Sequence, residues 1–85
     1  MNKKILIVDD DFPLRTVMLK ALSSKSVNVK SVSSISEAWV LISKEIFDLI
    51  ICDVVLPDGD GLELVKKIKE KKNDQKIIII SAQNN

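Results

Sequence analysis

The 85-residue sequence contains one cysteine, two glycines and two prolines. A lone cysteine, Cys52, excludes an internal disulfide and a cysteine-based metal cluster within this chain. Its apolar neighbours and the adjacent acidic residue predict a buried thiol with a raised pKa and low reactivity. Few glycines and prolines, together with 46% hydrophobic residues, exclude a disordered chain and indicate a single small globular domain over residues 1–85.

The sequence also lacks an excess of charge of one sign. Thirteen Lys and Arg residues nearly balance twelve Asp and Glu residues, and the net charge is +1. This balance gives no electrostatic basis for direct nucleic-acid binding by this segment. Glu63 and Glu70 lie among the lysines at positions 66, 67, 69, 71 and 72, which predicts a solvated helix face rather than a basic patch.

Long hydrophobic runs are missing as well. No apolar stretch approaches the ~20 residues that a membrane-spanning helix needs. The apolar run after the first lysines ends at Asp9, which is too short for the core of a signal peptide. We therefore expect a cytoplasmic protein without a membrane partner.

Short apolar runs separated by helical segments indicate an α/β fold. The predicted strands cover residues 5–8, 27–33, 48–52 and 77–80. Most of these runs are continuously apolar, as in strands buried on both faces, and the second alternates and has one wetter face. Strands that alternate with helices favour a parallel sheet covered by helices on both faces.

Capping residues mark where the three predicted helices begin. Asp11 precedes the first helix and Pro13 lies in its first turn. Ser34 and Glu37 have the spacing of a capping box for the second helix, and turn residues 56–61 precede the third. The predicted inner face of the first helix consists of Leu14, Val17, Met18, Ala21 and Leu22.

Polar residues follow the predicted strands at the edge where parallel sheets bind ligands. Asp9 and Asp10 follow the first strand, and Asp53 follows the third. If the first and third strands are neighbours, these carboxylates gather and repel one another, and a hard divalent cation such as Mg²⁺ relieves the repulsion. With Mg²⁺ bound, Asp53 is a candidate phosphoryl acceptor. Ser81 and the backbone N–H of Ala82 follow the fourth strand, in position to hold phosphoryl oxygens.

Four motifs, in order along the chain, resemble the receiver domain of two-component response regulators. They are ILIVDDD (5–11), LIICD (49–53), LPDGDG (56–61) and IIISA (78–82). The ending SAQN (81–84) is similar to receivers of nitrogen-regulation-type transcriptional activators. The resemblance implies a flavodoxin-like, doubly wound parallel sheet, here with four strands in the order 2-1-3-4 and three helices. It also implies a cytoplasmic phosphorelay component that regulates transcription.

The resemblance further implies roles for individual residues. Asp53 corresponds to the phosphoacceptor, which takes its phosphoryl group from a sensor histidine kinase and thereby switches a binding surface. Asp10 corresponds to the direct Mg²⁺ ligand, Asp9 to its neighbour acting through water, and the backbone carbonyl of Val55 to a further ligand. Ser81 corresponds to the switch hydroxyl. Such a domain is a phosphoacceptor rather than an enzyme, although it assists its own phosphorylation and dephosphorylation.

The chain departs from the family pattern after its fourth strand. The family has a further helix, strand and helix, and a lysine after the fifth strand that pairs with the phosphoryl oxygens; Lys76 precedes the fourth strand and does not match it. We therefore expect a partial receiver whose exposed fourth strand pairs with a second copy. One alternative is a phosphorylation-incompetent interaction module. Another is a small aspartyl-phosphate hydrolase, for which Asp9 and Asp11 fit the required spacing only loosely.

Overall fold

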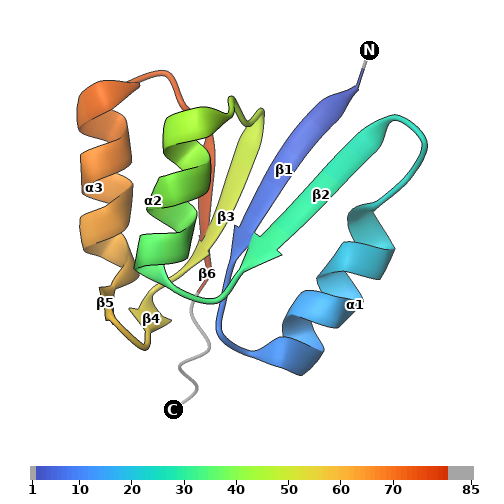
Figure 1. The fold of residues 1–85 in the computed structure, drawn as a ribbon, viewed down its shortest axis with the longest axis horizontal. Coiled ribbons are helices and arrows are strands. Elements are labelled where there is room, and N and C mark those ends of the chain that lie inside the picture. The colour runs from blue at the N-terminus through green and yellow to red at the C-terminus, as the bar shows by residue number, and fades with distance from the viewer. Residues whose placement is uncertain (1, 81–85) are drawn as a thin grey trace.

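The computed structural model describes residues 2–80 as a four-stranded parallel sheet with helices on both faces (Figure 1). The sheet has the strand order β2-β1-β3-β6. Its strands are β1 (Lys3–Val8), β2 (Val27–Val32), β3 (Leu49–Asp53) and β6 (Ile77–Ile80). The helices are α1 (Phe12–Leu22), α2 (Ile35–Lys44) and α3 (Gly61–Lys71). This arrangement confirms the predicted fold class and the order 2-1-3-4.

The hydrophobic core lies between the sheet and the pair α2 and α3. Alternate residues of β1 and β3 point to this side, and they pack against both helices and against Phe47. The buried members are Leu6, Val8, Ala38, Ile42, Phe47, Ile50, Cys52, Leu56, Leu64 and Ile68. Full burial of one such aliphatic side chain contributes about 1.5–3 kcal/mol, so this cluster holds β1 and β3 side by side.

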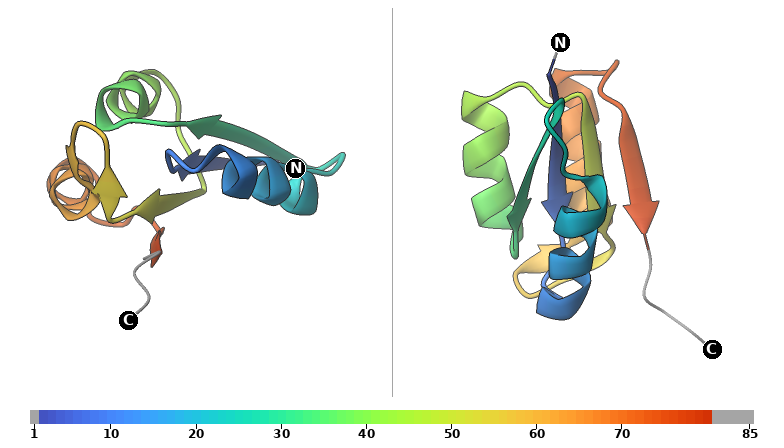
Figure 2. Two further views of the ribbon diagram at one scale, coloured as in Figure 1. Left: turned by 90° about the horizontal axis from the view of Figure 1, so that it is seen from below. Right: turned by 90° about the vertical axis from the view of Figure 1, so that its right-hand side faces the viewer.

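Within the part of the chain that the structure describes, α1 is the one helix on the opposite face of the sheet (Figure 2). It has no fully buried residue, and Val17 is 62% exposed although its spacing predicts an inward position. The predicted inner face is therefore wrong in part, since Leu14 and Met18 are half-buried while Ala21 is exposed. This helix is the one that covers this face among residues 2–80, and the side of the helix that points away from the sheet has no packing partner among these residues.

Strand β6 is an edge of the sheet within the described residues. It pairs with β3 on one side only, as the order of the strands shows. Ile78 and Ile79 are 49% and 46% exposed, so both faces of this strand are partly open. None of the helices described is long and apolar enough to cross a membrane.

The predicted caps account for the starts of α1 and α2. The Asp11 carboxylate accepts a hydrogen bond from the backbone N–H of Leu14 at 3.1 Å. The Ser34 hydroxyl accepts one from the N–H of Glu37 at 3.2 Å. The reciprocal half of the predicted capping box is wrong, because the Glu37 carboxylate accepts from the N–H of Ser33 at 2.9 Å instead of from that of Ser34.

The turn predicted over residues 56–61 forms most of a small antiparallel hairpin. Its strands are β4 (Val55–Leu56) and β5 (Gly59–Asp60). The carboxylate of Asp60 caps α3 by accepting a hydrogen bond from the N–H of Leu62 at 2.8 Å. The hairpin therefore joins the end of β3 directly to α3, beside the edge of the sheet where the acidic residues lie.

Candidate functional site

Three carboxylates meet at the carboxyl end of the central strands. Asp9 and Asp10 directly follow β1, and Asp53 is the last residue of β3. Because β1 and β3 pair in parallel, with Val8 opposite Cys52, these residues share one edge of the sheet. One carboxylate oxygen from each of the three residues lies within 4.8 Å of the others.

Burial makes this cluster costly when it is fully ionised. Asp9 is 1% exposed and Asp53 is 6% exposed, whereas Asp10 is exposed. Burial raises the pKa of Asp9 above its ordinary value, and the negative charges of Asp53, Asp11 and Asp10 raise it further. A hydrogen bond from the N–H of Asp11 to the Asp9 carboxylate, at 2.8 Å, lowers the pKa in part.

No lysine or arginine among residues 2–80 forms an ion pair with these carboxylates. The ion pairs in this part of the chain join Glu45 to Lys4 and Lys30, near the start of β1. The acidic cluster is a set of hard oxygen donors without a neutralising partner among these residues. That donor set fits Mg²⁺, which prefers a few carboxylates together with waters and a phosphate.

The backbone of Asp53 is packed tightly against the start of α3. A Cβ atom on Gly61 would lie 1.9 Å from the carbonyl oxygen of Asp53, so any other residue would displace the chain. The N–H of Gly61 donates to the carbonyl of Val54 at 2.6 Å. Glycine is thus required at position 61 by the close approach of the backbone of Asp53.

The position of Cys52 agrees with its predicted low reactivity. Cys52 is a buried free cysteine. Burial raises the pKa of its thiol to about 11, and the charges of Asp53, Asp9 and Asp60 add to this effect. A thiol with this pKa is almost entirely protonated near neutral pH and is a poor nucleophile.

Two of the predicted site residues, Ser81 and Ala82, lie outside the described residues. Strand β6 ends at Ile80, which is paired with Asp53. The roles of Ser81 and Ala82 remain predictions based on the sequence.

Sequence reasoning placed Asp58 in a loop and missed its contact with α2. Its two carboxylate oxygens accept hydrogen bonds from the N–H groups of Ile35 and Ser36, at 2.8 and 3.0 Å. These partners precede Asp58 by 23 and 22 residues, respectively, so no local sequence pattern signals the contact.

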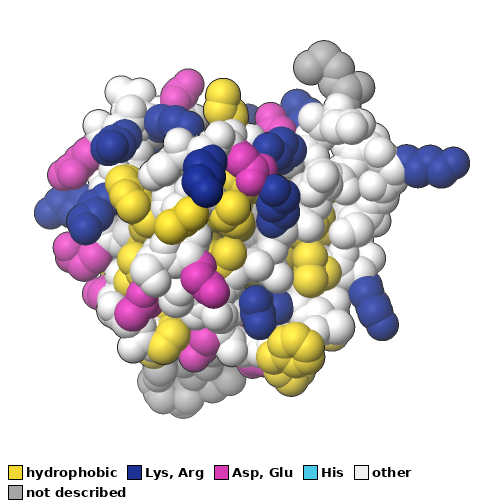
Figure 3. Space-filling model, viewed as in Figure 1, with side chains coloured by type: hydrophobic (Ala, Val, Ile, Leu, Met, Phe, Trp, Pro, Cys, Tyr) yellow, Lys and Arg dark blue, Asp and Glu magenta, His cyan; other side chains and the backbone are white. Residues whose placement is uncertain are grey.

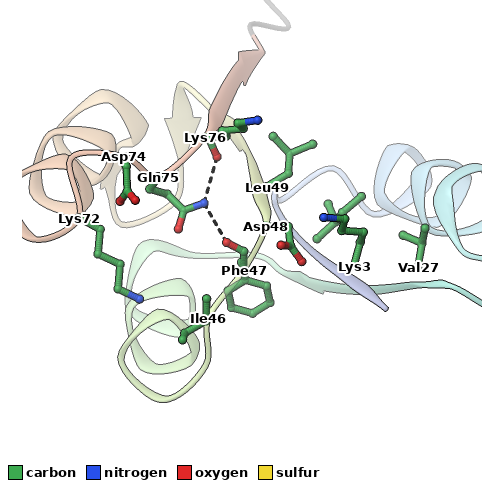
Figure 4. Close-up of a pocket in the computed structure, with 11 residues that line it drawn as sticks. Lys3, Val27, Ile46, Phe47, Asp48, Leu49, Lys72, Asp74, Gln75 and Lys76 are labelled. Atoms are coloured by element: carbon green, nitrogen blue, oxygen red, sulfur yellow. Dashed lines mark hydrogen bonds between the residues drawn. The ribbon is translucent and has the colours of Figure 1, made fainter. Parts of the chain in front are cut away.

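A separate cavity of about 520 Å³ lies at the opposite edge of the sheet, where the strands begin (Figure 4). Both basic and acidic residues line it, among them Lys3, Lys72 and Asp48. The side-chain amide of Gln75 donates to the carbonyls of Phe47 and Lys76 there, at 3.0 and 3.2 Å (Figure 4). Gln75 thus joins the segments that lead into β3 and β6, and this cavity holds none of the clustered carboxylates.

The face formed by α2 and α3 shows no patch of one charge. Figure 3 shows basic and acidic side chains mixed over this face, with hydrophobic side chains between them. The lysines of α3 belong to this mixed surface, which agrees with their prediction as a solvated helix face.

Comparison with known proteins identifies the family. The model of the response regulator receiver domain matches residues 5–85. The chain is 42% identical over 80 residues to the DNA-binding transcriptional regulator NtrC of Azospirillum brasilense, in a match that covers 94% of this chain and 17% of the relative. The chain thus spans about a sixth of the length of such curated relatives.

Solved structures agree with this assignment. A CheY-like receiver domain protein of Methanospirillum hungatei has a TM-score of 0.92 at 29% identity, covering 100% of this chain and 68% of that one. TrrA of Thermotoga maritima, solved with Mg²⁺ and BeF, has a TM-score of 0.89 at 32% identity, covering 96% and 71%. TrrA was also solved with the histidine kinase ThkA, and that copy has a TM-score of 0.88 at 31% identity, covering 98% and 72%. The fold is flavodoxin-like, and the chain belongs to the response regulator receiver domain family, whose members are signalling phosphoacceptors rather than classical enzymes.

Proposed function

We propose that Asp53 accepts a phosphoryl group from the phosphohistidine of a sensor histidine kinase, in a Mg²⁺-dependent reaction that switches a binding surface. The observation that carries this proposal is the group of three carboxylates within 4.8 Å at the carboxyl edge of the sheet. Asp53 ends a central strand there, and its neighbours lack a cationic partner among residues 2–80.

Each residue of the cluster has a proposed role. Asp10 and Asp53 would hold Mg²⁺ directly, the carbonyl of Val55 would complete the protein ligands, and Asp9 would act through water. When bound, Mg²⁺ neutralises the charge on the phosphoryl oxygens. Asp9 is kept in place by its own N–H, which donates to the carbonyl of Val32 at 3.0 Å.

The transfer itself exchanges one bond to phosphorus for another. A carboxylate oxygen of Asp53 attacks the phosphorus, an O–P bond forms, the P–N bond to histidine breaks, and the leaving imidazole nitrogen takes a proton. In this proposal the hydroxyl of Ser81 and the N–H of Ala82 bind the phosphoryl oxygens.

The relatives support the choice of partners. TrrA was solved in a complex with a histidine kinase, and NtrC is a DNA-binding transcriptional regulator. By analogy, we propose that residues 1–85 contribute receiver function to a transcription regulator, with a sensor histidine kinase as donor. The DNA-binding function of NtrC belongs to a protein of which this chain matches 17%.

Intact mass spectrometry tests the proposed chemistry. The chain is incubated with acetyl phosphate and Mg²⁺, alongside an Asp53→Asn variant and a sample with the metal chelated. We expect the mass of one phosphoryl group on the wild type only, and only with Mg²⁺. An unchanged mass in a sample shown to be folded would contradict the phosphoacceptor function.

The open edge of β6 favours a second candidate function, an interaction module. Ile78 and Ile79 are about half exposed, and β6 has one neighbouring strand among the described residues. An apolar edge of this kind pairs readily with another chain. We propose a homodimer through β6, and light scattering at roughly tens of micromolar, a range in which exposed edges associate, tests it. A monomer under these conditions would contradict the dimer and leave the phosphoacceptor proposal intact.

A further inference from the structure

We propose that Asp58 is a positioning residue for the acidic site: it clamps the β4–β5 hairpin to the start of α2 and so fixes the backbone beside Asp53. This inference rests on the proposed Mg²⁺-dependent function. Asp58 does not belong to the carboxylate cluster, and its effect would pass through the hairpin.

The contact of Asp58 with α2 is bidentate. One carboxylate oxygen accepts from the N–H of Ile35 at 2.8 Å, and the other accepts from the N–H of Ser36 at 3.0 Å. These are the first two residues of α2, whose N–H groups have no partner inside the helix. The hydroxyl of Ser34 satisfies the third, that of Glu37. A remote carboxylate therefore completes the cap of α2, and its charge is favourable at the positive end of the helix.

The packing of Gly59 shows independently that the hairpin is seated on α2. Gly59 has a φ of 153°, a conformation that favours glycine. A Cβ atom there would lie 2.9 Å from the Cδ1 atom of Ile35, the first residue of α2. The hairpin and the start of the helix are therefore in direct contact.

The hairpin leads from this clamp to the acidic site. It begins at Val55, two residues after Asp53, and ends at Asp60, whose carboxylate caps α3. The turn of the hairpin is thus held by the start of α2, and its last residue by the start of α3. Movement of the hairpin at Asp58 would be transmitted over three residues to the backbone of Val55, the proposed carbonyl ligand.

The other side of the clamp also leads to the site. Helix α2 follows β2 after a connection of two residues, Ser33 and Ser34. The last residue of β2, Val32, accepts the hydrogen bond from the N–H of Asp9 at 3.0 Å. Asp58 therefore links the segment that supports Asp9 with the segment that follows Asp53.

The two hydrogen bonds keep Asp58 ionised. The bond from Ile35 is the main cause that lowers the pKa of Asp58 below its ordinary value, and the bond from Ser36 adds to it. The clamp is therefore closed at neutral pH.

Calorimetric titration of the 85-residue chain with Mg²⁺ alone tests the proposal. The variants are Asp58→Ala, which loses both acceptor oxygens, and Asp58→Asn, which retains one. The matched control is Asp48→Ala, because the Asp48 carboxylate is also exposed and also accepts a backbone N–H, that of Lys4 at 2.7 Å, at the opposite edge of the sheet. We expect Asp58→Ala to weaken Mg²⁺ binding by about tenfold, the low end of the effect of losing a group that orients metal ligands. Asp58→Asn should weaken it less, and the control should leave it unchanged.

The comparison of variants separates the clamp from a plain charge effect. Loss of one negative charge alone would weaken binding equally in Asp58→Ala and Asp58→Asn, and the deficit would vanish at high salt. That result, or wild-type affinity in Asp58→Ala, would overturn the clamp while leaving the proposed function standing. A folded wild-type chain that binds no Mg²⁺ would overturn both. Circular dichroism confirms folding, and Asp58→Asn decides the outcome if Asp58→Ala does not fold.

Discussion

Replacing Asp9 by asparagine should stabilise the protein when Mg²⁺ is absent. Asp9 is almost fully buried, and its carboxylate lies within 4.8 Å of those of Asp10 and Asp53. Two like charges at that distance repel by about 3.5 kcal/mol at an effective dielectric constant of about 20, and by about 0.9 kcal/mol at the value of bulk water. Asparagine retains an acceptor oxygen for the N–H of Asp11, so the variant removes charge with little loss of hydrogen bonding. We expect a gain of about 1–3 kcal/mol in the free energy of unfolding.

Urea unfolding in a buffer with chelator measures this gain. The fluorescence of Trp39, the only tryptophan, reports on unfolding because its side chain packs against the core. The control is Asp48→Asn, which also removes one negative charge, but from an exposed residue outside the acidic cluster. Its free energy of unfolding should stay within about 0.5 kcal/mol of the wild type, as for most surface substitutions.

Addition of Mg²⁺ should reduce the difference in stability between Asp9→Asn and the wild type. A ligand that binds only the folded state stabilises it according to its concentration relative to Kd. The wild type should therefore gain more from Mg²⁺ than Asp9→Asn does, and the difference between them should shrink. An Asp9→Asn variant that is no more stable than the wild type in chelator would refute the idea that uncompensated carboxylates destabilise this site.

Three further predictions concern other parts of the fold. Gly61→Ala should lower the free energy of unfolding by about 3 kcal/mol or more in urea, because its methyl group would overlap the carbonyl of Asp53; a loss below about 1 kcal/mol would contradict the close approach. Glu45→Gln should lower the thermal midpoint of unfolding at neutral pH, because hydrogen bonds from Lys30 and Lys4 lower the pKa of Glu45. The stabilisation by these bonds is fully present above the ordinary pKa of 4.5 and is lost as the pH falls through the lower pKa of the folded state. The difference in thermal midpoint between the variant and the wild type should therefore close in acid, and a difference independent of pH would contradict this prediction. Cys52 should react with a disulfide reagent only as fast as the chain unfolds, and rapid labelling of the folded protein would show that the thiol is accessible.

The strands and local caps could be predicted from the sequence because their causes lie within a few residues. Continuous apolar runs marked β1 and β3, and Asp11 and Ser34 marked the starts of α1 and α2. The order of the strands could not be predicted in this way, because the apolar pattern of a strand does not show which other strand it pairs with. That order came from the resemblance to receiver domains, and with it came the meeting of Asp9, Asp10 and Asp53.

The exposure of α1 could not be read from its periodicity. The spacing of Leu14, Val17 and Met18 shows that the helix has an apolar side, but it does not show how much of that side meets another element. Among residues 2–80 a single helix lies on that face of the sheet, and Val17 is exposed. Burial depends on neighbours that the local pattern does not contain.

The two aspartates of the hairpin show the same distinction at the site itself. Asp60 caps the N–H of Leu62, two residues further on, so the cause of its role lies within the turn sequence itself. Asp58 has the same chemistry, but its donors in α2 come within reach only because β2, β1 and β3 pair in parallel and so bring the start of α2 and the end of β3 to one edge of the sheet. The carboxylate then satisfies two N–H groups that water would otherwise have to satisfy. A residue that looks like part of a surface turn thus becomes the contact through which the acidic site and α2 hold one another in place.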